Sequence, residues 1–114
     1  DDKKVAEAML KPNLWTPGVE QSFGDGVYGY RYQIPTVANR TTYLTPLTGF
    51  NNNTFKFINQ GGQIVRADDN APHCVSAYGG PFFWVNNSGT LCLFTTGDGA
   101  YPAKNLDMWC LYTK

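Results

Sequence analysis

The sequence predicts an all-β domain, an antiparallel β-sandwich of jelly-roll-like type, with a short helical segment at its start. About eight short segments alternate apolar and polar residues with a period of two, and Gly, Asn, Asp or Pro bounds each of them. Such segments at spacings of roughly 8–12 residues are typical of sandwiches, jelly rolls and barrels, and no helical pattern alternates with them. The chain has 114 residues, the usual size of one domain.

The first element is helical. Residues 1–11, "DDKKVAEAMLK", begin with two aspartates, which suit the positive end of a helix dipole, and continue with good helix formers. Pro12 biases the residue before it away from the helical conformation, so the segment ends there. We expect either a single helical turn or the end of a longer helix.

The first strand is expected over residues 27–34, "VYGYRYQI", after a turn at Asp25-Gly26, because glycine tolerates positive φ. The alternation places four large side chains on one face of this strand: Tyr28, Tyr30, Tyr32 and Ile34. That face packs either into the core or against a neighbouring subunit.

The other strands are expected at residues 41–47, 54–58, 63–67, 73–78, 81–86, 90–96 and 106–113. The first of these contains Pro46, so it is short or lies at a sheet edge. A turn at Gly61-Gly62 is expected before residues 63–67. The segment "FFWVNNSGTLCLF" predicts a hairpin that turns at Asn87-Ser88-Gly89.

Charge and hydropathy exclude two classes of partner. Nine basic residues balance nine acidic ones, and no run of Lys or Arg offers a footprint for nucleic acid. No apolar stretch approaches the roughly 20 residues that cross a bilayer, so no membrane insertion is expected. The sequence starts without Met or a signal peptide, and we expect it to begin at a processing site or inside a longer protein.

Three cysteines, Cys74, Cys92 and Cys110, lie in apolar segments. Because the number is odd, they cannot form a complete disulfide framework. We predict buried free thiols; one disulfide plus a free thiol is the alternative. Free thiols favour folding in a reducing cytosol.

No cofactor or metal is predicted. "FGDGVYG" and "TGDGAY" each offer one Asp between glycines, too few oxygen ligands for calcium, and one His with scattered Cys does not match zinc spacing. "GDGVYG" also lacks the Lys of a phosphate-binding loop.

Catalysis is not predicted either. A serine triad is not expected around the only histidine, His73, because the sequence has no Gly-x-Ser-x-Gly motif. A Cys–His pair is not expected either, because adjacent residues of a strand point to opposite faces and Cys74 would face away from His73. A pair of carboxylates for glycoside cleavage remains an alternative. Its candidates are Glu20 and four aspartates: Asp25, Asp68, Asp69 and Asp98.

A binding function is favoured by the aromatic content. Three Trp, seven Tyr and seven Phe exceed the needs of a small core, and the loops combine aromatic with amide and charged side chains. The candidate receptor contacts are a polar loop (Asp68, Asp69, Asn70 and His73), two rings around a Gly-Gly-Pro turn that suit a sugar face (Tyr78 and Trp84), and the residues after the second GDG (Tyr101 and Lys104). Core packing is the alternative for Trp84.

Both ends of the chain resemble phage and prophage tail-fibre or baseplate proteins. "WTPGVEQSFGDGVYGYRY" is similar to a segment in which "W-x-P-G-x-E" leads into "GDG-x-YG-x-R" at the first strand of a C-terminal domain, and "NLDMWCLYTK" is similar to the close of such domains. "GGQIVRADDN" and "VNNSGTLCLFTTGDG" look like their hairpins. The resemblance covers residues 12–114. Three cysteines exceed what that family leads us to expect, and residues 35–60 match none of its segments.

The resemblance implies that residues 12–114 are the receptor-binding tip domain of a fibre and residues 1–11 the end of a helical shaft or a linker. It implies a homotrimer on the virion tail that folds in the bacterial cytoplasm and acts outside the cell. Its function would be non-catalytic adhesion to a host polysaccharide or outer-surface protein. Trp109 is assigned to the core and Trp15 to the shaft junction. A secreted or pilus-borne lectin, toxin-binding subunit or inhibitor is the alternative, followed by a carbohydrate-cleaving enzyme.

Overall fold

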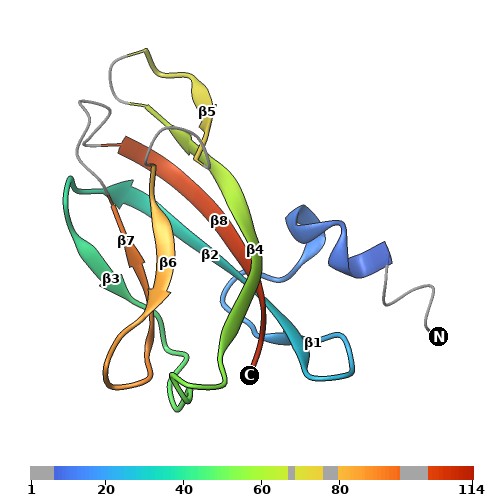
Figure 1. Ribbon diagram of the computed structural model, residues 1–114. Coiled ribbons are helices and arrows are strands. Elements are labelled where there is room, and N and C mark those ends of the chain that lie inside the picture. Colours follow the sequence, from blue (N-terminus) through green and yellow to red (C-terminus); the bar gives the residue numbers. More distant parts are fainter. Residues whose placement is uncertain (1–6, 67–68, 76–79, 96–102) are drawn as a thin grey trace.

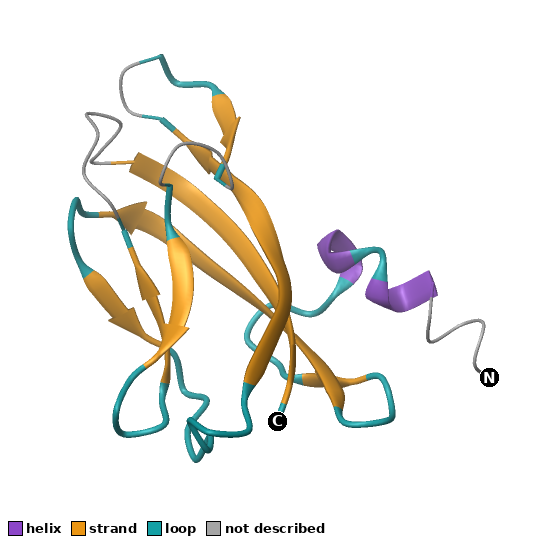
Figure 2. Cartoon of the chain, in the orientation of Figure 1, coloured by secondary structure: helices purple, strands orange, loops and turns teal. Residues whose placement is uncertain are grey.

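Two antiparallel β-sheets form the computed structural model of this chain, with a short helical segment beside them (Figures 1 and 2). The structure describes residues 7–66, 69–75, 80–95 and 103–114. The predicted all-β sandwich with a helical start is confirmed. In the described part of the chain, no helix has both the length and the apolar character needed to span a membrane.

The larger sheet has five strands in the order β1-β2-β8-β4-β5. They are β1 (Gln21–Ser22), β2 (Val27–Val37), β8 (Ala103–Thr113), β4 (Lys56–Val65) and β5 (Pro72–Cys74). Strand β8 lies at the centre, antiparallel to both β2 and β4. The long strands of this sheet cross the whole molecule in Figure 1.

The smaller sheet has three strands in the order β3-β7-β6: β3 (Thr42–Leu44), β7 (Leu91–Phe94) and β6 (Phe82–Val85). The pairs β2–β8 and β3–β7 join strands that are far apart in the sequence. The pair β4–β5 lies between β3 and β7 in the sequence, so the three pairs enclose one another. This nesting across two sheets gives the jelly-roll-like arrangement. Strands β6 and β7 form the predicted hairpin, whose turn is held by Asn86: its side-chain oxygen accepts from the backbone N–H of Ser88 and Thr90, 3.0 Å each.

The core lies between the sheets and follows the period-two alternation. Tyr30, Ile34 and Tyr112 of the larger sheet meet Leu91 and Leu93 of the smaller one. Each such buried side chain contributes roughly 1.5–3 kcal/mol of transfer free energy. The face of β2 that carries the tyrosines therefore packs inward, which settles the choice left open by the sequence.

The turn predicted at Asp25-Gly26 is confirmed. Asp25 and Gly26 have φ of 55° and 76°, and the Val27 N–H donates to the Gly24 carbonyl at 3.0 Å. The positive φ angles match the turn geometry that joins two antiparallel strands with the usual twist, and here the turn joins β1 to β2.

The turn predicted at Gly61-Gly62 is wrong. Both glycines lie inside β4, which runs unbroken where two strands were expected. A Cβ on Gly61 would lie 3.0 Å from the Trp109 ring, and one on Gly62, whose φ is +139°, would lie 2.2 Å from the Asp107 carbonyl oxygen. The glycines are therefore required by close approach to β8 and not by a reversal of the chain.

The segment before β1 covers part of the larger sheet on the side away from the core. Residues 7–9 are helical, and Pro12–Leu14 form a 3-10 turn. Trp15 follows and is buried against Gly29, with its indole N–H donating to the Ala8 carbonyl at 2.7 Å. This packing closes one end of the sheet's outer face.

Two sequence assignments need correction. Trp109 is not in the core, because β8 alternates and Trp109 shares the outer face with Asp107. No disulfide joins the three cysteines, all of which lie in the described residues. Cys92 and Cys110 are buried as predicted, but Cys74 is exposed because β5 is an edge strand.

Candidate functional site

The candidate site lies on the outer face of the larger sheet. Two cross-strand rows meet there: Gln33, Asp107 and Gln63 form one row, and Arg31, Trp109 and Gly61 form the next. Each row takes one residue from β2, one from β8 and one from β4, and side chains that lie opposite or diagonal to each other on one face are within reach of one another.

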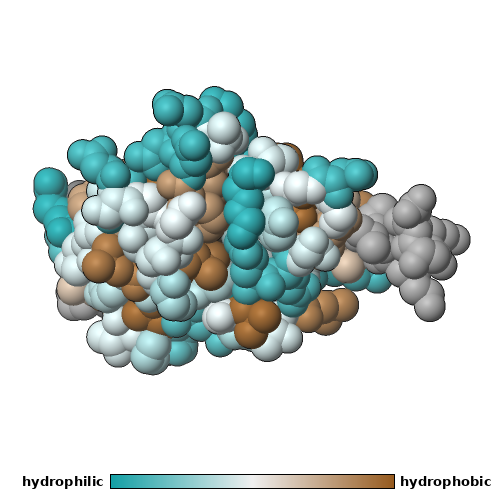
Figure 3. All heavy atoms as spheres, turned by 90° about the horizontal axis from the view of Figure 1, so that it is seen from below, coloured by the Kyte–Doolittle hydropathy of each residue, from teal (hydrophilic) through white to brown (hydrophobic). Residues whose placement is uncertain are grey.

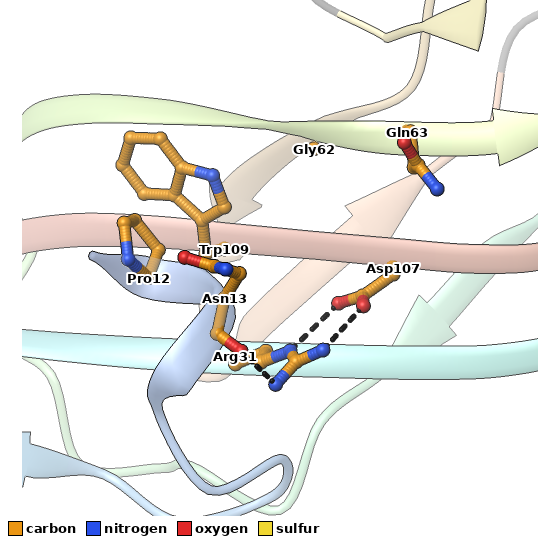
Figure 4. A pocket seen from close by; sticks show the side chains of 7 residues that line it. All are labelled: Pro12, Asn13, Arg31, Gly62, Gln63, Asp107 and Trp109. Carbon is orange, nitrogen blue, oxygen red and sulfur yellow. Dashed lines mark hydrogen bonds and ion pairs between the residues drawn. The ribbon is translucent and has the colours of Figure 1, made fainter. Parts of the chain in front are cut away.

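The pair Arg31–Asp107 lies at the centre of this face. The guanidinium binds the carboxylate in bidentate fashion, with Nε 2.9 Å from Oδ1 and Nη2 2.6 Å from Oδ2 (Figure 4). Gln33 donates a further hydrogen bond to Oδ2 at 3.2 Å. The Arg31 hydrogen bonds lower the pKa of the Asp107 carboxyl, while burial opposes the shift. Both groups are therefore charged near neutral pH and compensate each other.

Arg31 also holds the N-terminal segment against the larger sheet. Its Nη1 donates to the backbone carbonyls of Asn13 at 2.9 Å and Trp15 at 3.0 Å. One guanidinium thus ties β2, β8 and the N-terminal segment together, which is the planar, multi-donor geometry that arginine provides.

Two hollows adjoin on this face. The first has a volume of about 420 Å³ and is lined by Pro12, Asn13, Arg31, Gly62, Gln63, Asp107 and Trp109 (Figure 4). The second has a volume of about 530 Å³ and is lined by Gln33, Ile34, Pro35, Gln63, Asn105, Leu106 and Asp107. They share Gln63 and Asp107, and we call the combined hollow the trough. Both volumes fall within the roughly 300–1,000 Å³ that is usual for ligand pockets.

Trp109 forms the aromatic part of the trough. Its indole lies over Gly61, where the lack of a side chain leaves room for the ring. The Trp109 and Trp15 rings meet edge to face, with 5.9 Å between their centroids. Its Nε1–H has no hydrogen-bond partner among the residues that the structure describes. A partly exposed indole with a free donor can offer both a packing surface and a hydrogen bond.

The residues predicted from the sequence are only partly brought together. Asp69, in the loop between β4 and β5 beside Asn70, is hydrogen-bonded at 2.8 Å to His73 of β5. The His73 hydrogen bond lowers the pKa of the exposed Asp69 carboxyl. Trp84 belongs to the other sheet, and Lys104 is exposed on β8 opposite Thr36 and Val65. Asp68, Tyr78 and Tyr101 lie outside the described residues.

The trough residues were missed. Alternation in "NLDMWCLYT" already places Asp107 and Trp109 on one face of a strand, which was a usable signal. The partners Arg31 and Gln63 come from strands far away in the sequence, and only the register of β8 with β2 and β4 brings them there.

The glutamate of the carbohydrate-cleaving alternative has structural contacts. Glu20 accepts a hydrogen bond from the Tyr112 hydroxyl and pairs with Lys114 at 2.8 Å. Asp25 lies at the tip of the β1–β2 turn. In the described ranges, no three His, Cys, Asp or Glu side chains gather as a metal site would require.

Comparison of the chain with models of known protein families, with curated proteins and with solved structures finds no match. Function is therefore inferred from the surface of the molecule.

Proposed function

We propose that this domain is a non-catalytic adhesion module, the tip domain of a phage or prophage tail fibre or baseplate protein. It would bind a polysaccharide or an outer-surface protein of a bacterial cell. The observation that carries the proposal is the trough, a preformed hollow on rigid strands whose ionisable groups are already paired with each other.

The electrostatics of the trough favour binding over chemistry. A general acid or base works best when its pKa lies near the working pH. Arg31 instead lowers the pKa of Asp107, and Asp107 in turn raises that of Arg31 through the same hydrogen bonds. Both shifts move the groups away from the range in which they would exchange protons, so the pair acts as a fixed platform.

A homotrimer is part of the proposal, and the outer face of the smaller sheet is the surface that we assign to the subunit contact. Leu44, Phe82 and Trp84 are 64%, 39% and 37% exposed there, and Phe94 lies beside Phe82 with ring centroids 5.6 Å apart. A contiguous apolar face of this kind usually marks an interaction site. By contrast, the end of the molecule in Figure 3 shows separate hydrophobic patches among hydrophilic residues. Trp84, expected above to contact a receptor, would then pack between subunits.

Trimerisation suits adhesion. Several weak sites on one fibre, each of roughly millimolar affinity, bind a cell surface effectively once they engage together.

The test is adhesion of the fluorescently labelled domain to a panel of bacterial strains. We expect binding to a subset of strains, and loss of binding for Gln63→Arg, which fills the trough with a large side chain. The matched control is Asn53→Arg, an exposed amide in the loop before β4. A domain that adheres to no strain, or a Gln63→Arg variant that adheres like the parent, would contradict the proposal. Release of reducing sugar from cell-surface polysaccharide would instead support the enzyme alternative.

A further inference from the structure

From the trough we infer a ligand class: it binds a neutral oligosaccharide of two or more pyranose rings. The inference rests on the proposed adhesion function and names the chemistry that the trough selects. Three properties of the trough carry it, namely its charge, its hydrogen-bonding groups and its aromatic surface.

The first property is the absence of an available cation among the lining residues that the structure describes. Arg31 is the only basic residue among the described residues that line the trough, and four of its five N–H groups are engaged: two with Asp107 and one each with the carbonyls of Asn13 and Trp15. The Asp107 carboxylate compensates its charge at 2.6 Å. An acidic sugar would bring a second carboxylate beside Asp107 without a free partner, which is unfavourable in a partly desolvated site.

The second property is the set of amide side chains. Asn13, Gln33, Gln63 and Asn105 line the two hollows, and the Asp107 oxygens add acceptors. An amide presents a donor and an acceptor side by side, and a sugar hydroxyl is itself both donor and acceptor. The amides therefore match the hydrogen-bonding groups of a neutral polyol. Such a ligand leaves the ion pair between Arg31 and Asp107 intact.

The third property is the indole of Trp109 at one end of the trough. The C–H face of a pyranose ring is apolar and packs on an aromatic ring, while the ring's hydroxyls point sideways toward polar groups. Figure 4 shows the indole with Pro12 at one end of the first hollow and the polar side chains of Asp107 and Gln63 toward the other. One ring that stacks on Trp109 thus has hydroxyl partners within the same hollow.

The length of the ligand follows from the two hollows. Each is large enough for at least one sugar ring, and they meet at Gln63 and Asp107. A chain that stacks on Trp109 continues past this junction toward Gln33 and Asn105. The inferred ligand is accordingly a segment of a neutral polysaccharide and not a single sugar.

The experiment measures binding of defined polysaccharides to the intact domain by intrinsic tryptophan fluorescence and by competition of cell adhesion. The neutral probes are dextran, mannan and galactan, and the acidic probes are alginate, polygalacturonate and hyaluronan. We expect at least one neutral probe, and no acidic one, to bind and to compete with adhesion. Because no net charge is involved, raising salt from about 50 to 500 mM should change the affinity less than about twofold.

Variants locate the site. Trp109→Ala should weaken binding of the neutral probe about tenfold, whereas Trp109→Phe, which keeps an aromatic face, should stay within about threefold of the parent. Phe57→Ala is the matched control, because it truncates a partly exposed aromatic side chain of β4 that does not line the trough. Should Trp109→Ala fail to fold, Gln63→Arg blocks the same trough.

The outcomes separate the two proposals. The inference about the ligand would be wrong if cell adhesion were inhibited only by the acidic probes, or by none of the polysaccharides. In either case the proposed adhesion function would remain. Binding of neutral probes that survives both Trp109→Ala and Gln63→Arg would also overturn it. Failure of the domain to adhere to any strain would remove the proposed function itself.

Discussion

Asp107 shows how one residue can organise a surface without reacting. Its carboxylate accepts from Arg31 and Gln33, and Arg31 in turn secures the backbone of Asn13 and Trp15. The stability that this carboxylate contributes depends on its charge, because the Arg31 hydrogen bonds are made to the ionised form.

The pH dependence follows from the lowered pKa of Asp107. An unfolded Asp has a pKa of about 3.9, so the contribution is fully present above that value and is lost as pH falls through the lower folded pKa. We expect the free energy of unfolding of the parent to fall more steeply below about pH 4 than that of Asp107→Asn. Urea titrations from neutral to acidic pH measure this, and identical slopes for the two proteins would contradict it.

The buried hydroxyls of Tyr30 and Tyr112 differ in their hydrogen bonding. The Tyr30 hydroxyl has no hydrogen-bond partner within the described chain, and burial, followed by the neighbouring Tyr32 and Cys110, raises its pKa to about 12. The Tyr112 hydroxyl donates to Glu20, and burial followed by this hydrogen bond raises its pKa further.

Removal of the two hydroxyls should have opposite effects. Tyr30→Phe should raise the free energy of unfolding by about 1 kcal/mol, because a desolvated and unpaired group is lost. Tyr112→Phe should lower it by about 1–2 kcal/mol, because Glu20 loses its donor in a half-buried setting. Equilibrium denaturation measures both, and a destabilised Tyr30→Phe would show that its hydroxyl has a partner.

At the scale of elements, β4 marks the limit of prediction from the sequence. Alternation correctly located the tyrosine face of β2, and turn residues correctly located the Asp25-Gly26 turn and the β6–β7 hairpin, because these features depend on nearby residues. Gly61-Gly62 was expected to be a turn because the flexibility of glycine usually serves a chain reversal. Here glycine is needed because a neighbouring strand lies too close for a side chain, and that strand is more than 40 residues away in the sequence. The trough was missed for the same reason, since strand register decides which residues share a row.

Gly62→Ala tests the close approach of β4 to β8. A Cβ there would meet the Asp107 carbonyl oxygen and would also be strained at φ +139°, so we expect a loss of about 2–4 kcal/mol in unfolding free energy. Gly26→Ala is the matched control: it has positive φ but no atom within 4 Å of the added Cβ. It should cost only about 1–2 kcal/mol. Equal losses in the two variants, measured by thermal or urea unfolding, would exclude a steric role for β8.

For the whole molecule, the two outer sheet faces differ in character. The larger sheet presents the polar trough, and the smaller one presents Leu44, Phe82 and Trp84. Because the two faces lie on opposite sides of the molecule, the larger sheet can bind the receptor while the smaller sheet contacts the other subunits of the proposed trimer.

The proposed trimer can be tested separately from adhesion. Leu44→Lys combined with Phe82→Lys places two charges on the apolar face and should convert a trimer into monomers in multi-angle light scattering, because a buried unpaired charge is costly. Val19→Lys, which changes an exposed apolar residue before β1, should leave the trimer intact. A parent domain that is monomeric at micromolar concentration would reject this assignment of the face.

The central position of β8 has a consequence for biosynthesis. This strand is the last of the eight along the sequence, yet it separates β2 from β4 in the larger sheet. Until residues 103–113 are available, β2 and β4 each have one edge without its partner strand, and the backbone groups of that edge are open to pairing with other nascent chains. The larger sheet is therefore complete only once β8 is available, and we expect protection of β2 and β4 until then to raise the yield of folded protein.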